Sequence, residues 1–266
     1  MADKKRSSAT VAKPYISGAA VDENTVRNAL KFFGVLLMIL FMTFLVCTMT
    51  GFKSTLLRIA VNVLIEGLVM LILYAKGAEL GTEDVARGEI LFQHEQKGVE
   101  ITQKERKIPF NRYKGFMIGL IGSSLFVICA IILAFTSKKQ MTGAGVLPSW
   151  TDAFMGRSEI SGALGQYSKG DPVTFTDILR VIVRIMIMPF ISLAGSENRS
   201  LLLTMERISP ILVLLPAAAY GIGYLQGPAK RRMIHTEIAD NNHRRIIKEK
   251  KARRQRIAPK GPQQLN

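Results

Sequence analysis

The sequence predicts an all-α, polytopic helical membrane protein, and two observations carry that prediction. Hydrophobic residues make up 48% of the 266 residues. Although 21% of the residues are charged, the mean hydropathy is positive, at +0.20. The two kinds of residue are also segregated, because stretches of roughly 20 apolar residues alternate with strongly polar ones. A soluble protein would intersperse them at helix or strand period. We therefore predict a bundle of bilayer-spanning helices.

Four apolar blocks qualify as spans. They cover residues 32–49, 56–75, 115–135 and 201–225. At 1.5 Å per residue, each reaches across about 30 Å of hydrocarbon, with tilt or snorkelling where the block is short. The intervening segments are a polar N-terminal arm (1–31), a loop (76–114) and a basic tail (227–266). Within the loop, Thr82, Glu83 and Asp84 predict the start of a short separate helix over 83–97.

A fifth apolar block, residues 178–194, contains Arg180 and Arg184 on one helical face and is interrupted by Pro189. Each Arg at the bilayer centre would cost about 2.5–3.5 kcal/mol. With four spans, the arm, loop and tail share one side and hold 6, 8 and 12 of the 36 Lys and Arg. A fifth span would move the tail across and remove this asymmetry. The positive-inside rule therefore favours four spans over five, with both termini cytoplasmic and 178–194 interfacial or re-entrant.

Glu66 lies at the middle of the second predicted span, with Asn62 one turn and Arg58 two turns before it. A carboxyl group in hydrocarbon is costly unless it is protonated or paired, so this polar stripe should face other helices or water. One interpretation is an ion, proton or substrate site. The interpretation that we favour is a structural hydrogen bond between helices, with Arg58 snorkelling.

Glu206 and Arg207 lie near one end of the last predicted span. They could form an ion-pair cluster with Arg180 and Arg184 if the 178–194 segment folds back. The simpler interpretation is a helix-end charge that reaches water, and we favour it.

Small residues recur at four-residue spacing in two spans. They are Gly115, Gly119 and Ser123 in the third span, and Ala219 and Gly223 in the fourth. Small residues at i and i+4 make a flat groove that another helix can approach closely. The pattern predicts helix packing, either within the chain or with a partner.

The tail carries a basic patch. Its members are Lys230, Arg231, Arg232, Arg244, Arg245, Lys248, Lys250, Lys251, Arg253, Arg254 and Arg256. The simplest interpretation is topology fixation by a solvated helix. The next is attraction to anionic lipids, worth about 1 kcal/mol per base near the surface. The third is RNA or ribosome binding through phosphates, which the absence of Phe, Tyr and Trp from the tail weakens.

No catalytic motif occurs in the sequence. Cys47 and Cys129 lie in apolar blocks, and the three His show no metal-ligand spacing. Phosphate-binding loops and nucleophile motifs are also missing. We therefore expect no cofactor, no metal and no enzymatic activity. Our leading hypothesis is a subunit or scaffold of a larger membrane assembly, in a plasma membrane by default; the alternative is a homo-oligomeric channel or carrier using Glu66.

Overall fold

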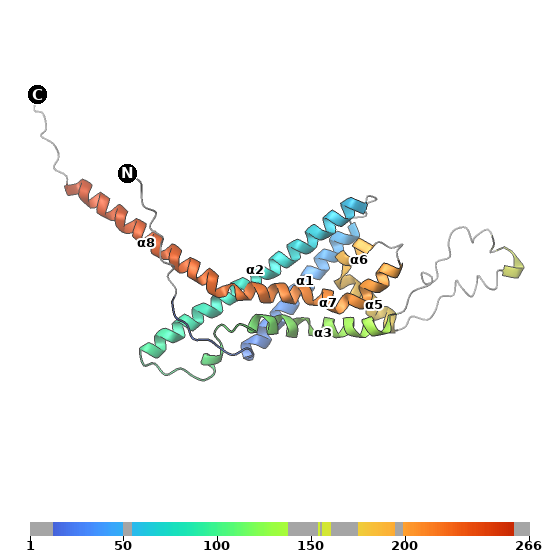
Figure 1. Ribbon diagram of the computed structural model, residues 1–266, viewed down its shortest axis with the longest axis horizontal. Helices are drawn as coiled ribbons and strands as arrows, with labels where there is room; N and C mark the ends of the chain where they lie inside the picture. Colours follow the sequence, from blue (N-terminus) through green and yellow to red (C-terminus); the bar gives the residue numbers. More distant parts are fainter. Residues whose placement is uncertain are drawn as a thin grey trace, which may run out of the picture.

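The computed structural model describes residues 13–49, 55–137, 154, 156–160, 175–194 and 199–257. All regular structure in these residues is helical. Among the described residues, four helices are long and apolar enough to cross a membrane. They are α1 (Glu23–Met49), α2 (Thr55–Gln96), α3 (Lys114–Thr136) and α7 (Arg199–Leu225), the last running on into α8 (Gly227–Ile257) (Figure 1). The predicted all-α class with four spans is thereby confirmed.

Helix α1 begins at Glu23, well before the apolar block that starts at residue 32. Asp22 and Thr25 form a reciprocal cap: the Thr25 N–H donates to Asp22 Oδ1 (2.6 Å), and the Asp22 N–H donates to Thr25 Oγ1 (3.0 Å). The cap supplies partners for the first free N–H groups of the helix. The last part of the predicted arm over residues 1–31 is therefore helical, and its residues 1–12 lie outside the described part of the chain.

Helix α2 is one continuous helix of 42 residues, about 63 Å long at 1.5 Å per residue. The helix runs without a break through residues 83–97, so the prediction of a separate short helix there is wrong. No proline interrupts residues 55–96, and the buried face of the helix continues past the apolar block through Ala78, Val85 and Glu89. The helix stops where Gly98 adopts a left-handed φ of +72°, with the Val99 N–H bonded to the His94 carbonyl (3.0 Å).

The N-terminal arm from residue 13 lies against α2 and against the segment that leads into α3. The backbone N–H of Ile16 donates to the Gly88 carbonyl (3.2 Å), and that of Gly18 donates to the Phe110 carbonyl (3.0 Å). The same segment before α3 contains a short 3-10 helix, η1 (Glu105–Lys107). Arm, α2 and pre-α3 segment are thus joined at the end of the bundle from which α8 leaves, here called the α8 end (Figure 1).

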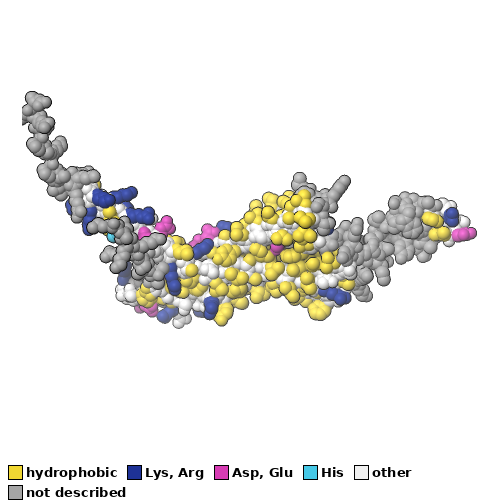
Figure 2. Space-filling view, turned by 45° about the horizontal axis from the view of Figure 1, so that its top comes forward, with side chains coloured by type: hydrophobic (Ala, Val, Ile, Leu, Met, Phe, Trp, Pro, Cys, Tyr) yellow, Lys and Arg dark blue, Asp and Glu magenta, His cyan; other side chains and the backbone are white. Residues whose placement is uncertain are grey.

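Helix α7 lies at the centre of the bundle between α2 and α3. Gly77 and Gly81 of α2 are so close to the α7 backbone at Tyr220 and Tyr224 that a Cβ atom at either glycine would collide with it. This close approach places small residues where two helix backbones cross. On the face that Figure 2 shows, apolar side chains cover the middle and most charged side chains lie toward the ends, as expected for a surface that faces lipid.

The 178–194 segment forms two short helices, α5 (Phe175–Met186) and α6 (Met188–Ala194), with Pro189 at the second position of α6. Val183 and Ile187 are fully buried in the core that α1, α3 and α7 share. The pair packs inside the bundle at the end opposite α8, which we call the α5–α6 end (Figure 1). This packing fits the re-entrant alternative better than a helix lying on the surface.

Candidate functional site

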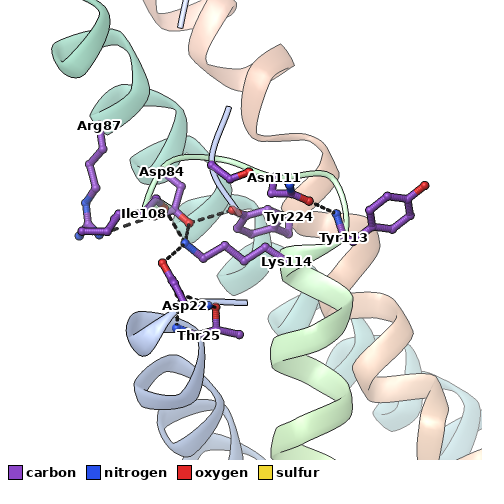
Figure 3. Close-up of polar contacts among 10 residues, drawn as sticks. Asp22, Thr25, Asp84, Arg87, Ile108, Asn111, Tyr113, Lys114 and Tyr224 are labelled. Carbon is purple, nitrogen blue, oxygen red and sulfur yellow. Dashed lines mark hydrogen bonds and ion pairs between the residues drawn. The ribbon is translucent and has the colours of Figure 1, made fainter. Parts of the chain in front are cut away.

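A buried polar cluster joins four parts of the chain at the α8 end. Lys114, the first residue of α3, is completely buried. Its Nζ lies 3.2 Å from Asp22 Oδ2 and 3.1 Å from Asp84 Oδ2, and it donates to the Ile108 carbonyl (2.6 Å) (Figure 3). The ammonium group therefore replaces its hydration shell with two carboxylates and a carbonyl oxygen, which is what makes a buried charge tolerable.

The same carboxylate of Asp84 also receives a hydrogen bond from α7. The Tyr224 hydroxyl donates to Asp84 Oδ2 (2.8 Å), and Arg87 Nη1 lies 3.7 Å from Asp84 Oδ1 (Figure 3). We call Asp22, Asp84, Arg87, Lys114 and Tyr224 the Lys114 cluster. Because its members come from the arm, α2, α3 and α7, it braces these four segments against one another.

A second cluster ties α2 to α8. Glu89 accepts from Arg231 Nε (3.0 Å) and lies 2.8 Å from His235 Nε2. Glu89 and His235 are both buried, and Arg231 is about one-quarter exposed. This Glu89 cluster sets the direction in which α8 leaves the bundle.

Sequence reasoning did not single out Lys114, Asp84, Glu89 or His235 as site residues. A signal was present, because small and apolar residues continue at helical spacing from Ala78 to Val85, beyond the predicted end of the span. That periodicity could have placed Asp84 and Glu89 on or beside a buried face. Their partners come from distant segments, however, and spacing along one helix does not identify them.

The structure brings Arg180 and Arg184 of α5 together with Glu206 of α7. Glu206 Oε1 lies 3.0 Å from Arg180 Nε and 2.6 Å from Arg184 Nη2, and Glu206 is only 1% exposed. Arg180 also contacts Asp177 Oδ1 at 2.9 Å. The simpler interpretation, a helix-end charge that reaches water, fits the exposed Arg207 but not Glu206.

The polar stripe on α2 divides into two environments. Asn62 is 2% exposed; its Nδ2 donates to the Arg58 carbonyl (2.8 Å) and to Ser192 Oγ of α6 (2.9 Å). Its Oδ1 accepts from the Cys47 thiol of α1 at 3.5 Å. Asn62 is therefore a connection between three helices, as interhelical amides commonly are.

Glu66, one turn further along, is half-buried and forms no hydrogen bond or ion pair with any described residue. It lines a cavity of about 30 Å³ together with Thr43, Pro189 and Pro216. A cavity of this size holds one or two water molecules. Pro189 and Pro216 each lack an N–H, so neither can donate to the carbonyl one turn before it.

The predicted small-residue faces are used within the chain. A Cβ at Gly115 would collide with the Tyr224 side chain, one at Gly119 with Ala217, and one at Gly223 with the Tyr74 carbonyl. Ser123 is buried and donates to the Gly119 carbonyl (2.8 Å), and Ala219 is half-buried. The three glycines let α7 approach α2 and α3 closely.

The basic patch lies along α8, and its two halves differ. Arg231 is held by Glu89, whereas every side chain from residue 237 to 253 is exposed. Arg254 and Arg256 belong to the helix, but their side chains are outside the described set. The far half of α8 is thus a solvated, positively charged helix.

These features define the class: an all-α, multi-pass membrane protein braced by three buried ionic clusters. Comparison with models of protein families, with curated proteins and with solved structures finds no match.

Within the described ranges, no group of three or more His, Cys, Asp or Glu is placed to hold a metal ion. The three clusters hold helices together, whereas the Glu66 carboxyl lines a small cavity.

Proposed function

We propose that the protein is a non-catalytic subunit or scaffold of a larger membrane assembly, with its α8 end in the cytoplasm and α8 as the docking helix. The orientation is supported by the distribution of Lys and Arg, since the arm, loop and tail together carry 26 of the 36. All three segments join the α8 end of the bundle.

The observation that carries the proposal is the exposed half of α8. A helix without tertiary contacts gains little stability from its own hydrogen bonds in water, and most helices in proteins are stabilised by packing one face. Residues 237–253 remain helical with every side chain exposed, including Ile238, Ile246 and Ile247. Such a surface is suited to a partner that covers it.

Charge and distance favour a partner over the lipid surface for this half. Residues 244–256 hold eight Lys and Arg against one Glu. Residue 244 lies about 25 Å along the helix from Gly227, at 1.5 Å per residue, and α8 leads away from the bundle (Figure 1). Electrostatic attraction to a membrane decays within about 8 Å at physiological salt. The block is therefore positioned to meet an acidic partner beyond the headgroups.

The two clusters at the α8 end support the same function. The Glu89 cluster holds the first turns of α8 on α2, and the Lys114 cluster holds α2 on α3 and α7. A docking helix held in one direction loses less entropy on binding than a loose tail does.

Native mass spectrometry of the protein extracted from its own membranes tests the proposal. We expect a hetero-complex that dissociates when Lys248, Lys250 and Lys251 are changed to Gln. The matched control changes Lys97, Lys104 and Lys107 to Gln, which removes the same charge from the same end of the molecule. A monodisperse protein with no partner, or equal loss of the partner in both variants, would contradict the proposal.

The orientation has a separate test. Glu159 lies between α3 and α5, and Arg245 lies on α8; both side chains are exposed. Each is changed to Cys in a separate variant. In intact cells, a membrane-impermeant maleimide should label Glu159→Cys and should label Arg245→Cys only after permeabilisation. The reverse pattern would place the α8 end outside.

The Glu66 cavity supports a second candidate function, a homo-oligomeric channel or carrier. A half-buried carboxyl beside a water-sized cavity and two prolines is a setting in which a proton or cation could be held. Four spans form a narrow bundle, so transport would require several copies.

A further inference from the structure

An open groove of about 510 Å³ lies at the α8 end, between the arm, the segment before α3 and the junction of α7 with α8. Its wall is partly apolar, from Phe110, Leu225 and Pro228, and partly polar, from Ser17, Arg112 and Tyr113. The volume is in the range of small-ligand sites. The groove is distinct from the exposed half of α8 and from the Glu66 cavity.

The depth of the groove follows from the helices that border it. Tyr113 directly precedes Lys114, the first residue of the span α3, and Leu225 is the last residue of the span α7. The groove therefore lies where the hydrocarbon ends and the headgroups begin. Tyr113 is 66% exposed, and its side chain points away from the Lys114 cluster (Figure 3), as expected for an aromatic side chain at headgroup level.

The charge in the groove comes from Arg112, which is exposed and forms no ion pair with any residue that the structure describes. Lys114, two residues away, cannot take its place because Asp22 and Asp84 hold its ammonium group. No acidic residue is among the described residues that line the groove. Arg112 thus remains available to an anion, and its planar guanidinium suits two oxygens of a phosphate.

Asn111 holds the groove in shape. Its Nδ2 donates to the Gly18 carbonyl (2.8 Å), and its Oδ1 accepts from the Tyr113 N–H (3.0 Å). The bond to Gly18, with that from the Gly18 N–H to the Phe110 carbonyl, ties the arm to the pre-α3 segment. Ser17 and Arg112 therefore line the groove from two segments that are held together. The groove is therefore built before any ligand arrives.

We propose that this groove binds the headgroup of an acidic phospholipid, with the phosphate on Arg112 and Ser17 and the start of the acyl chains against Leu225 and Pro228. The occupant follows from the position, since a groove that opens at headgroup depth beside two spans meets lipid. The bound lipid fills the space between arm and α7.

The experiment uses the full chain in neutral detergent with phosphatidylcholine, titrated with phosphatidylglycerol and followed by native mass spectrometry. We expect the wild type to retain one phosphatidylglycerol. Arg112→Gln should bind it about tenfold more weakly or worse, a difference of about 1.4 kcal/mol or more. Ser17→Glu, which places an acid in the groove, should lose it as well.

The matched control is Arg27→Gln. Arg27 is exposed on α1 and does not line the groove. Retention by Arg27→Gln together with loss by Arg112→Gln supports the site. Equal loss in both variants would mean diffuse surface attraction and would overturn the proposal. Displacement of the lipid by millimolar inorganic phosphate would also overturn it, because the groove would then be a site for free phosphate.

Discussion

The Nζ atom of Lys114 lies 3.1 Å from Oδ2 of Asp84, and both side chains are buried to within 1% of full burial. These two residues are 30 positions apart on different helices. Their pairing joins the start of α3 to the part of α2 that continues past its apolar block. It therefore adds an ionic contact between helices at the polar end of the bundle, beyond the apolar core.

Replacement of Lys114 by Met should destabilise the fold strongly. The change leaves the buried Asp22 without its cation and Asp84 with only Arg87 at 3.7 Å. Removing one partner of a buried pair costs about 3–5 kcal/mol. Thermal unfolding in detergent should show a clearly lower midpoint. Lys76→Met is the control, since the Lys76–Glu79 pair is more than half exposed and should contribute about 1 kcal/mol or less. Equal melting of the two variants would contradict a bracing role.

Gly81→Ala should separate α2 from α7. The added Cβ would meet the Tyr224 backbone, which cannot move aside without shifting a helix, and overpacking of this kind costs about 1–3 kcal/mol. Gly67→Ala, on the same helix, meets nothing within 4 Å and should be neutral or slightly stabilising. The unfolding midpoints of the two variants check this, and a Gly81→Ala protein as stable as Gly67→Ala would count against the close crossing.

Glu206→Gln should loosen the packing of the α5–α6 pair on the bundle. Without the Glu206 carboxylate, Arg184 loses its counter-charge, and the buried Arg180 keeps only the partly exposed Asp177. Weakening the compensation of a buried charge is costly. Hydrogen exchange over residues 178–187 should become at least about tenfold faster, corresponding to 1.4 kcal/mol. Asp177→Asn is the control, because Asp177 is 42% exposed and its loss should have a small effect. Unchanged exchange in Glu206→Gln would show that apolar packing alone holds the pair.

If the protein transports ions or protons, Glu66→Gln should abolish flux in liposomes while leaving thermal unfolding unchanged. Gln nearly preserves the shape of the side chain but carries no charge at any pH, so a cation loses its carboxylate ligand. Glu79→Gln, an exposed residue on α2, is the control and should retain flux. Equal flux in Glu66→Gln and the parent protein would remove the transport candidate.

Much of the architecture could be predicted from residue patterns. The apolar blocks at 32–49, 56–75, 115–135 and 201–225 correspond to spanning helices, because in hydrocarbon a backbone must satisfy its hydrogen bonds internally. The helix boundaries on the polar side were less predictable. The cap formed by Asp22 and Thr25, and the burial of Ala78 and Val85, extend α1 and α2 beyond those blocks.

The candidate sites divide in the same way. Glu66, Asn62 and Glu206 stood out because a polar residue in an apolar block is costly and therefore conspicuous. Lys114, Asp84 and Glu89 did not, because charged residues next to a span are ordinary and usually solvated. Only their burial distinguishes them, and burial depends on which helices pack around them.

By itself, therefore, the sequence determined that the chain is an all-α membrane protein with four spans, because span length and charge exclusion are local properties that the bilayer thickness imposes. The tertiary structure decided which charges are buried and paired, that α5–α6 packs inside the bundle, and that α8 projects from it. These outcomes depend on contacts between distant segments, such as Lys114 with Asp22 and Glu89 with His235. Short-range electrostatics and packing act only after the helices have come together.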